Sequence, residues 1–247
     1  YTTATTEDID TFQGFTKIDI SDFNVVQLDA TVIVTGNEES NIIKIADFTK
    51  ADIDGKGGTD VIEINVGENL IIDLRDQSGT EGSFKNIEGI AVTTNYQPSN
   101  ITLIGDDNDN IFQSGSGDDT VYGYGGNDFI YVDPGSDIHY GGEGKDTAIF
   151  ASPHRYHVIE IDTEDPTKIT ISGEGRPTNS NQGNIGTYEF NNFEFFQFAD
   201  SKYELKAGKL TKVKEIFEDK SAGLIFDVGI TEVLSTEKHD GYIYADS

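Results

Sequence analysis

The chain of 247 residues contains no cysteine. It therefore has no disulfide bond, no thiolate metal site and no cysteine nucleophile. No stretch approaches the roughly 18 consecutive apolar residues of a membrane-spanning helix. The first residues, YTTATTEDID, lack the basic and apolar segments of a signal peptide. We expect no membrane insertion, and either a soluble chain exported without such a signal or a fragment of a larger multidomain protein.

Basic residues are also scarce. Lys and Arg total 17 against 45 Asp and Glu, which gives a formal net charge of −28. Phosphate recognition needs a basic patch, so nucleic acid is excluded as a partner, and anionic membranes are disfavoured. A folded chain with this charge must place many carboxylates near each other, and bound cations are one remedy for their repulsion.

Large apolar residues are present in quantity, with 15 Phe, 11 Tyr and many Ile and Val. These residue types favour pleated strands, whereas a disordered acidic chain has few of them. The composition therefore predicts a packed all-β structure.

Five consecutive nonapeptides run without a gap from residue 105 to residue 149. Their sequences are GDDNDNIFQ, SGSGDDTVY, GYGGNDFIY, VDPGSDIHY and GGEGKDTAI. Position four is Gly in four of the five units. Position six is acidic in four of them and reads Asn110, Asp119, Asp128, Asp137, Asp146. A fixed period of this kind indicates a stack of equivalent structural units.

Each unit supplies a six-residue turn, rich in residues that tolerate positive φ, and a three-residue strand. Two units then make one coil, so that alternate turns stack on the same edge. Position-six side chains of alternate units would face each other, with backbone carbonyls that Gly123, Gly125 and Gly141 leave uncovered. Such an all-oxygen cage suits calcium. The register predicts at least three calcium ions, between Asn110 and Asp128, Asp128 and Asp146, and Asp119 and Asp137, and it couples folding to metal binding.

These nonapeptides resemble the RTX, or hemolysin-type, calcium-binding repeats, with consensus GGxGxDxUx, where U is a large apolar residue. The resemblance implies a parallel β-roll that folds outside the cell after type I secretion by Gram-negative bacteria. Repeats three and five match best. Repeat one has Asn110 in place of Asp, and repeat four begins with VDP and has His139 at U.

Two earlier segments echo the unit, GNEESNIIK with Asn41 at position six and GKGGTDVIE with Asp60 there. We therefore expect Asn41 and Asp60 to be calcium ligands as well. Residues 70–74, 87–92 and 101–104 are predicted strands of the same roll or solenoid. A second echo relates FKNIE, from Phe84, to FNNFE, from Phe190. We expect one structural unit with capping strands at 1–35, a calcium-binding roll with irregular loops at 36–205, and a cap at 206–247 with a short helix from Lys212 and two strands.

Positions seven and nine of the repeats carry aromatic and apolar residues that a bare roll would expose. Flanking strands cover this surface, or it binds a ligand. Tyr122 and Tyr140 lie one coil apart and are the candidate pair for a ligand platform.

Motifs for catalysis are missing. The sequence has neither HExxH nor GxSxG, and His154 and His157 lack a third zinc ligand in sequence. We therefore expect a non-enzyme. The hypothesis we prefer is a ligand-binding module of a secreted RTX adhesin that binds a peptide or glycan on another cell. Two alternatives are a structural or secretion module, and an accessory region of a toxin or hydrolase.

Overall fold

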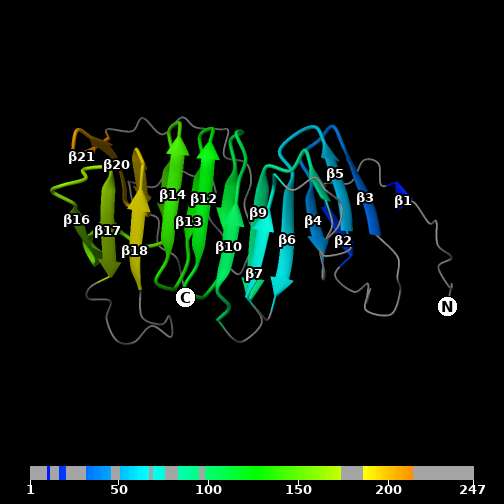
Figure 1. Cartoon of the computed structure of the whole chain (residues 1–247), viewed down its shortest axis with the longest axis horizontal. Coiled ribbons are helices and arrows are strands. Elements are labelled where there is room, and N and C mark those ends of the chain that lie inside the picture. Colours follow the sequence, from blue (N-terminus) through cyan, green and yellow to red (C-terminus); the bar gives the residue numbers. More distant parts are fainter. Residues whose placement is uncertain are drawn as a thin grey trace, which may run out of the picture.

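The computed structural model describes residues 10–11, 17–20, 32–45, 51–66, 69–75, 83–94, 98–173 and 186–213. Within these residues the chain forms strands β1 to β21 and one short 3-10 helix, η2 (His154–Tyr156), with no α-helix (Figure 1). The prediction of an all-β fold is confirmed. No helix in the described part of the chain is long and apolar enough to cross a membrane.

The largest sheet has ten strands and runs the length of the molecule. Pairing is parallel from β2 to β19, and the last two strands pair antiparallel. In spatial order the strands are β2 (Lys17–Ile20), β4 (Ile42–Ile45), β6 (Val61–Val66), β9 (Gly89–Thr94), β11 (Ile111–Gln113), β13 (Phe129–Val132), β15 (Thr147–Phe150), β19 (Phe195–Phe198), β20 (Ser201–Lys206) and β21 (Lys209–Lys212).

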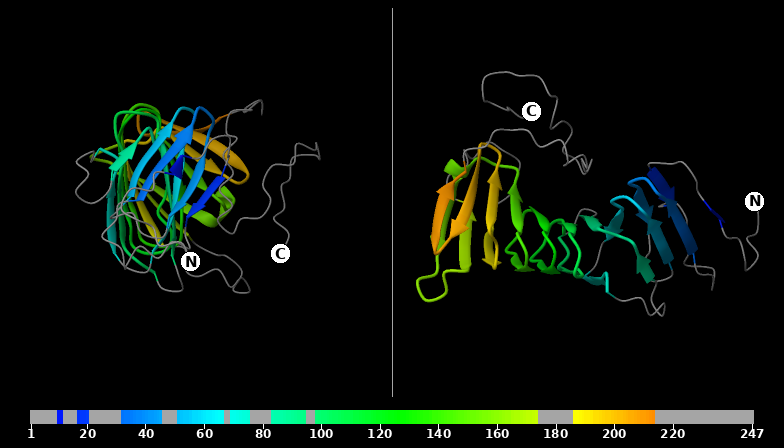
Figure 2. Two further views of the ribbon diagram at one scale, coloured as in Figure 1. Left: turned by 90° about the vertical axis from the view of Figure 1, so that its right-hand side faces the viewer. Right: turned by 90° about the horizontal axis from the view of Figure 1, so that it is seen from above.

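Two further sheets provide the other side of the fold (Figure 2). The four-stranded sheet has the order β1 (Asp10–Thr11), β3 (Val32–Asn37), β5 (Ala51–Lys56) and β8 (Ser83–Lys85). The seven-stranded sheet has the order β16 (His157–Ile161), β17 (Lys168–Gly173), β18 (Thr187–Asn191), β14 (Ile138–Glu143), β12 (Thr120–Gly125), β10 (Ile101–Ile104) and β7 (Leu70–Asp73). Its antiparallel pairs are β16 with β17 and β17 with β18.

The nonapeptide period sets the pairing register. Ile111 pairs with Phe129, and Phe129 with Thr147, so partners are two nonapeptides apart in the ten-stranded sheet. Thr120 and Ile138 show the same spacing in the seven-stranded sheet. The chain therefore alternates between the two sheets with every nonapeptide, as a parallel β-roll requires.

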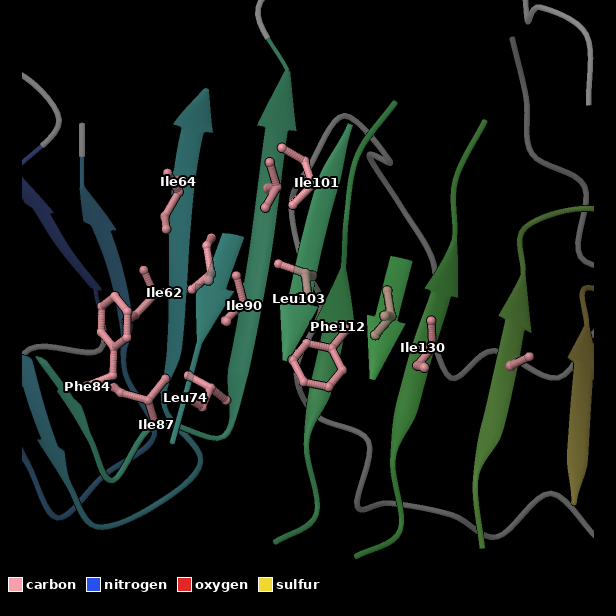
Figure 3. Packing of buried hydrophobic residues seen from close by; sticks show 14 of the residues in the cluster. Ile62, Ile64, Leu74, Phe84, Ile87, Ile90, Ile101, Leu103, Phe112 and Ile130 are labelled. Atoms are coloured by element: carbon pink, nitrogen blue, oxygen red, sulfur yellow. The ribbon is translucent and has the colours of Figure 1, made fainter. Parts of the chain in front are cut away.

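One apolar cluster fills the space between the sheets (Figure 3). The inward residue of each repeat is position eight, and Phe112, Val121 and Ile130 are at most 1 % exposed there. Ile62 and Phe84 extend the same cluster into the first half of the chain. Side chains alternate between the two faces of a strand, so positions seven to nine of a repeat present a single side chain to the core. The strands are not all three residues long as expected, because β12 and β14 have six residues and continue into the next turn.

Parallel pairing begins before residue 36. Strands β1 and β2 pair with β3 and β4 in the same parallel sense as the rest. At the other end, β16, β17, β20 and β21 are the flanking strands. The predicted helix from Lys212 and the strands after it lie outside the described residues, except that Lys212 itself ends β21.

Candidate calcium sites

The repeat turns stack on two edges of the roll. Turns 105–110, 123–128 and 141–146 lead into β11, β13 and β15 of the ten-stranded sheet. Turns 114–119 and 132–137 lead into β12 and β14 of the seven-stranded sheet. This is the alternation that the sequence predicts.

The position-six side chains form a ladder along each edge. The backbone N–H of Asn110 donates to Oδ1 of Asp128 at 2.8 Å, and the N–H of Asp128 donates to Oδ1 of Asp146 at 2.9 Å. On the other edge the N–H of Asp119 donates to Oδ1 of Asp137 at 2.9 Å. The structure therefore brings together the three pairs named from the sequence.

The second carboxylate oxygen of each ladder aspartate is buried and makes no hydrogen bond with the residues that the structure describes. These oxygens are Oδ2 of Asp60, Asp119, Asp128, Asp137 and Asp146. A buried polar atom without a partner is rare in native proteins, and an ion is one of the few explanations. Five equivalent oxygens in one pattern therefore suggest a common ligand.

Glycine keeps the space beside these oxygens open. A Cβ on Gly123 would collide with Oδ2 of Asp128 and with the carbonyl oxygen of Gly141. A Cβ on Gly141 would likewise collide with Oδ2 of Asp146. Gly125 differs, because the nearest atom to its Cβ would be Cα of Asp107 at 3.4 Å. Gly123 and Gly141, which begin their turns, therefore line the gap between coils, whereas Gly125 does not.

Burial raises the pKa of every ladder aspartate. The pKa is about 6 for Asp119 and Asp146, about 7 for Asp60 and Asp128, and about 8 for Asp137. Neighbouring carboxylates add to the effect of burial, as Asp146 does for Asp128. Ionisation without a cation is therefore unfavourable, because each charge would stand in a site with little water and other negative groups.

These residues fit calcium, which takes six to eight oxygen ligands. No group of three or more His, Asp or Glu side chains able to hold a metal occurs in the described part of the chain. Much of a coordination shell would therefore be backbone carbonyl oxygen, of the kind that Gly123 and Gly141 present to the gap. When bound, calcium would neutralise the ladder carboxylates and tie adjacent coils together.

Asn110 and Asn41 differ from the aspartates. Oδ1 of Asn110 accepts the N–H of Asp106, and its Nδ2 donates to the Asp106 carboxylate. Asn41 makes the same two bonds with Asn37. Both side chains fold back onto their own turns, so neither presents an unpartnered oxygen to the gap.

Repeat four forms its coil despite its unusual sequence. Asp133 accepts the N–H of Gly115 at 3.1 Å and a hydrogen bond from Gln113 at 3.2 Å. His139 occupies the inward position, 1 % exposed, and its ring stacks on Phe190. Burial lowers the His139 pKa to about 3, so the ring is neutral and serves as part of the core.

The two candidate platform tyrosines also meet. The rings of Tyr122 and Tyr140 stack at 4.9 Å between centroids with an interplanar angle of 3°. The ring centroids of Tyr122 and Tyr124 are 6.3 Å apart. The guanidinium carbon of Arg75 lies 4.3 Å from the ring centroid of Tyr124. Tyr124 and Tyr140 are 45 % and 37 % exposed, so this outer face remains open.

Residues 104–138 match the family model of the RTX calcium-binding nonapeptide repeat (4 copies). The match supports the RTX family. RTX repeats bind calcium generally and are typical of secreted proteins. No curated protein matches the chain. The RTX match stops before the fifth repeat, although Asp146 of that repeat continues the ladder. It also leaves out the Asp60 turn, where Asp60 accepts the N–H of Asn41 in the same way.

The ladder contains two residues that the nonapeptide pattern did not predict. Glu88 accepts the N–H of Asp60 at 2.7 Å, and Glu194 accepts the N–H of Asp146 at 2.9 Å. Their only sequence signal is the repeated pattern in FKNIE and FNNFE. Neither segment contains the Gly and Asp of the nonapeptide, so the period does not find them.

Proposed function

We propose that this chain is a calcium-dependent ligand-binding module of a secreted RTX adhesin, and that its ligand is a peptide or glycan on the surface of another cell. It is a non-enzymatic part of a larger multidomain protein exported by type I secretion, and it binds neither nucleic acid nor membranes. Its coils form one continuous β-solenoid held by several calcium ions.

The observation that carries the proposal is the open aromatic face on the seven-stranded sheet. Tyr122, Tyr124 and Tyr140 lie on adjacent strands β12 and β14, and Ile71 on β7 is 65 % exposed. Contiguous exposed apolar surface on a soluble protein often marks a binding site. Hydroxyl groups on the rings also offer hydrogen bonds to a polar ligand.

Calcium and ligand binding would be coupled through the same two strands. Tyr122 and Tyr140 each lie three residues after a ladder aspartate, Asp119 and Asp137 respectively. The hydrogen bond between these aspartates fixes the spacing of β12 and β14. An ion between the two turns would therefore rigidify the strands that hold the rings, and its removal would loosen them.

Binding arrays of peptides and glycans test the proposal, with calcium and with excess chelator. We expect binding only with calcium, and its loss in Tyr122→Ala and Tyr140→Ala. Phe129→Ala is the matched control, because Phe129 is 39 % exposed but belongs to the ten-stranded sheet. Loss of binding in the control alone would contradict the assignment of the ligand face.

The mutual stacking of Tyr122 and Tyr140 favours a second candidate, a structural or secretion module without a ligand of its own. Cross-strand aromatic pairs stabilise sheets. In that case no array member binds, and Tyr140→Ala lowers only the free energy of unfolding.

A further inference from the structure

The ladder on the ten-stranded edge consists of two separate runs with the same design. One run is Asn41, Asp60 and Glu88, and the other is Asn110, Asp128, Asp146 and Glu194. Each begins with an asparagine that bonds its own turn and ends with a glutamate. The family match covers part of the second run and none of the first.

The two glutamate turns replace the nonapeptide turn with a shorter one. Asn86 and Asn192 both have a left-handed backbone, with φ of 50° and 57°, two residues before Glu88 and Glu194. A Cβ on Gly55 would collide with the carbonyl oxygen of Asn86, and one on Gly141 with that of Asn192. Each asparagine therefore presents its carbonyl oxygen to the preceding turn, as Gly141 does to Gly123.

The last aspartate of each run faces this turn with an oxygen that has no partner. Asp60 is 0 % exposed, and its Oδ2 makes no hydrogen bond among the described residues. Its Oδ1 accepts the N–H of Asn41 at 2.8 Å, so only Oδ2 is left for another ligand. Asp146 repeats the arrangement with Glu194.

Glutamate suits the end of a run. One carboxylate oxygen of Glu88 accepts a hydrogen bond from the N–H of Asp60, as Oδ1 of the aspartates does elsewhere in the ladder. In this turn the carbonyl of Asn86 and the acid Glu88 are two residues apart, whereas Gly141 and Asp146 of a nonapeptide are five apart. The extra methylene of glutamate lets its carboxylate reach the preceding coil from the shorter turn. The buried Oδ2 of Asp60, the carboxylate of Glu88 and the carbonyl oxygen of Asn86 together make a ligand set for a hard divalent cation.

We propose that Asp60 and Glu88, with the carbonyl oxygen of Asn86, form a calcium site of their own outside the repeat array, and that Asp146 and Glu194 form the corresponding site at the end of the array. The inference rests on the calcium dependence in the proposed function. It adds a second, independent calcium-binding run in the first half of the chain.

Native mass spectrometry of the full chain in calcium tests the proposal by counting bound ions. Glu88→Gln keeps an oxygen for the Asp60 N–H but removes the charge, so we expect one calcium ion fewer than in the wild type. Glu39→Gln makes the same change at an exposed position of the neighbouring turn, and it should keep the full count. Glu194→Gln should lose one ion, and the double variant two.

Hydrogen exchange on the wild-type chain is a second readout that needs no variant. Calcium should slow exchange of the Asn41 and Asp60 amides, whose acceptors are Asp60 and Glu88. Protection confined to residues 105–147, or a full ion count in Glu88→Gln, overturns the separate site. A wild-type chain that binds no calcium overturns the proposed function as well, so the two failures are distinguishable.

Discussion

Replacing Asp128 by asparagine should change stability in opposite directions with and without calcium. Asp128 stands in the middle of its run, bonded through Oδ1 to the Asn110 amide and through its own N–H to Asp146. Asparagine keeps an oxygen for the first bond and an N–H for the second. The substitution therefore removes mainly the charge on Oδ2.

Without calcium this charge is unfavourable. Raising the pKa from 3.8 to about 7 corresponds to about 4 kcal/mol at ~1.4 kcal/mol per unit. The effective dielectric constant of protein sites is about 20 even where they are buried, which reduces this to about 1–2 kcal/mol. We therefore expect Asp128→Asn to be more stable than the wild type by about that amount in chelator at about pH 8.

With calcium the order reverses. Each site adds about 2.7 kcal/mol when free calcium is about 100 times the dissociation constant. Asp128 faces Asn110 on one side and Asp146 on the other, so its loss affects up to two sites and about 3–5 kcal/mol. Asp137→Asn should lose about half as much, because Asp137 ends its ladder.

Urea unfolding followed by circular dichroism measures both effects. The same series in chelator and in excess calcium gives the two free energies of unfolding for each variant. A variant that is destabilised equally in both conditions would refute the reasoning, because the carboxylate would then act only through packing.

Three further predictions concern the calcium-free state, the glycine gap and the core. In chelator, the free energy of unfolding should fall as pH rises from about 5 to about 8. The folded pKa values of the ladder aspartates, about 6 to 8, exceed the unfolded value. The folded state therefore binds more protons than the unfolded state in this range. A stability that rises over this range, measured by urea unfolding, would contradict the sign. Gly123→Ala should weaken calcium binding measured by calorimetry, whereas Gly125→Ala should leave it unchanged, because only the methyl group on residue 123 fills the gap between coils. Equal calcium affinities of the two variants would argue against Gly123 as part of a site. Phe112→Ala should lower the free energy of unfolding by about 3–5 kcal/mol, since the ring is 0 % exposed, and a loss below about 1 kcal/mol in urea unfolding would count against its place in the core.

The nonapeptide period predicted the regular part of the fold. It identified Phe112 and Ile130 as equivalent strand positions and placed Asp128 beside Asp146, because both follow from counting residues per coil. The segments at 70–74 and 101–104 were also predicted as strands, and they form β7 and β10. Hydrophobic pattern is sufficient where a strand is short and buried.

The period could not predict how each run ends. Glu88 and Glu194 lie in turns of a different length, so counting in nines passes over them. The period also did not predict that the Asn110 side chain bonds Asp106, because these hydrogen bonds depend on the local turn rather than on the coil. The period also did not predict that β7 belongs to the seven-stranded sheet and β8 to the four-stranded sheet, because neither strand lies in a nonapeptide.

The one-way order of the ladder limits how such an array can change in length. Each ladder amide donates its hydrogen bond to a carboxylate of the coil that follows, and Glu194 is the last acceptor. Insertion of a single nonapeptide between Asp146 and Glu194 would place a turn of the opposite edge between them and leave Glu194 without its partner. Insertion of two would preserve both edges. Growth at this end of the array is therefore compatible with the Asp146–Glu194 hydrogen bond only in whole coils of two nonapeptides.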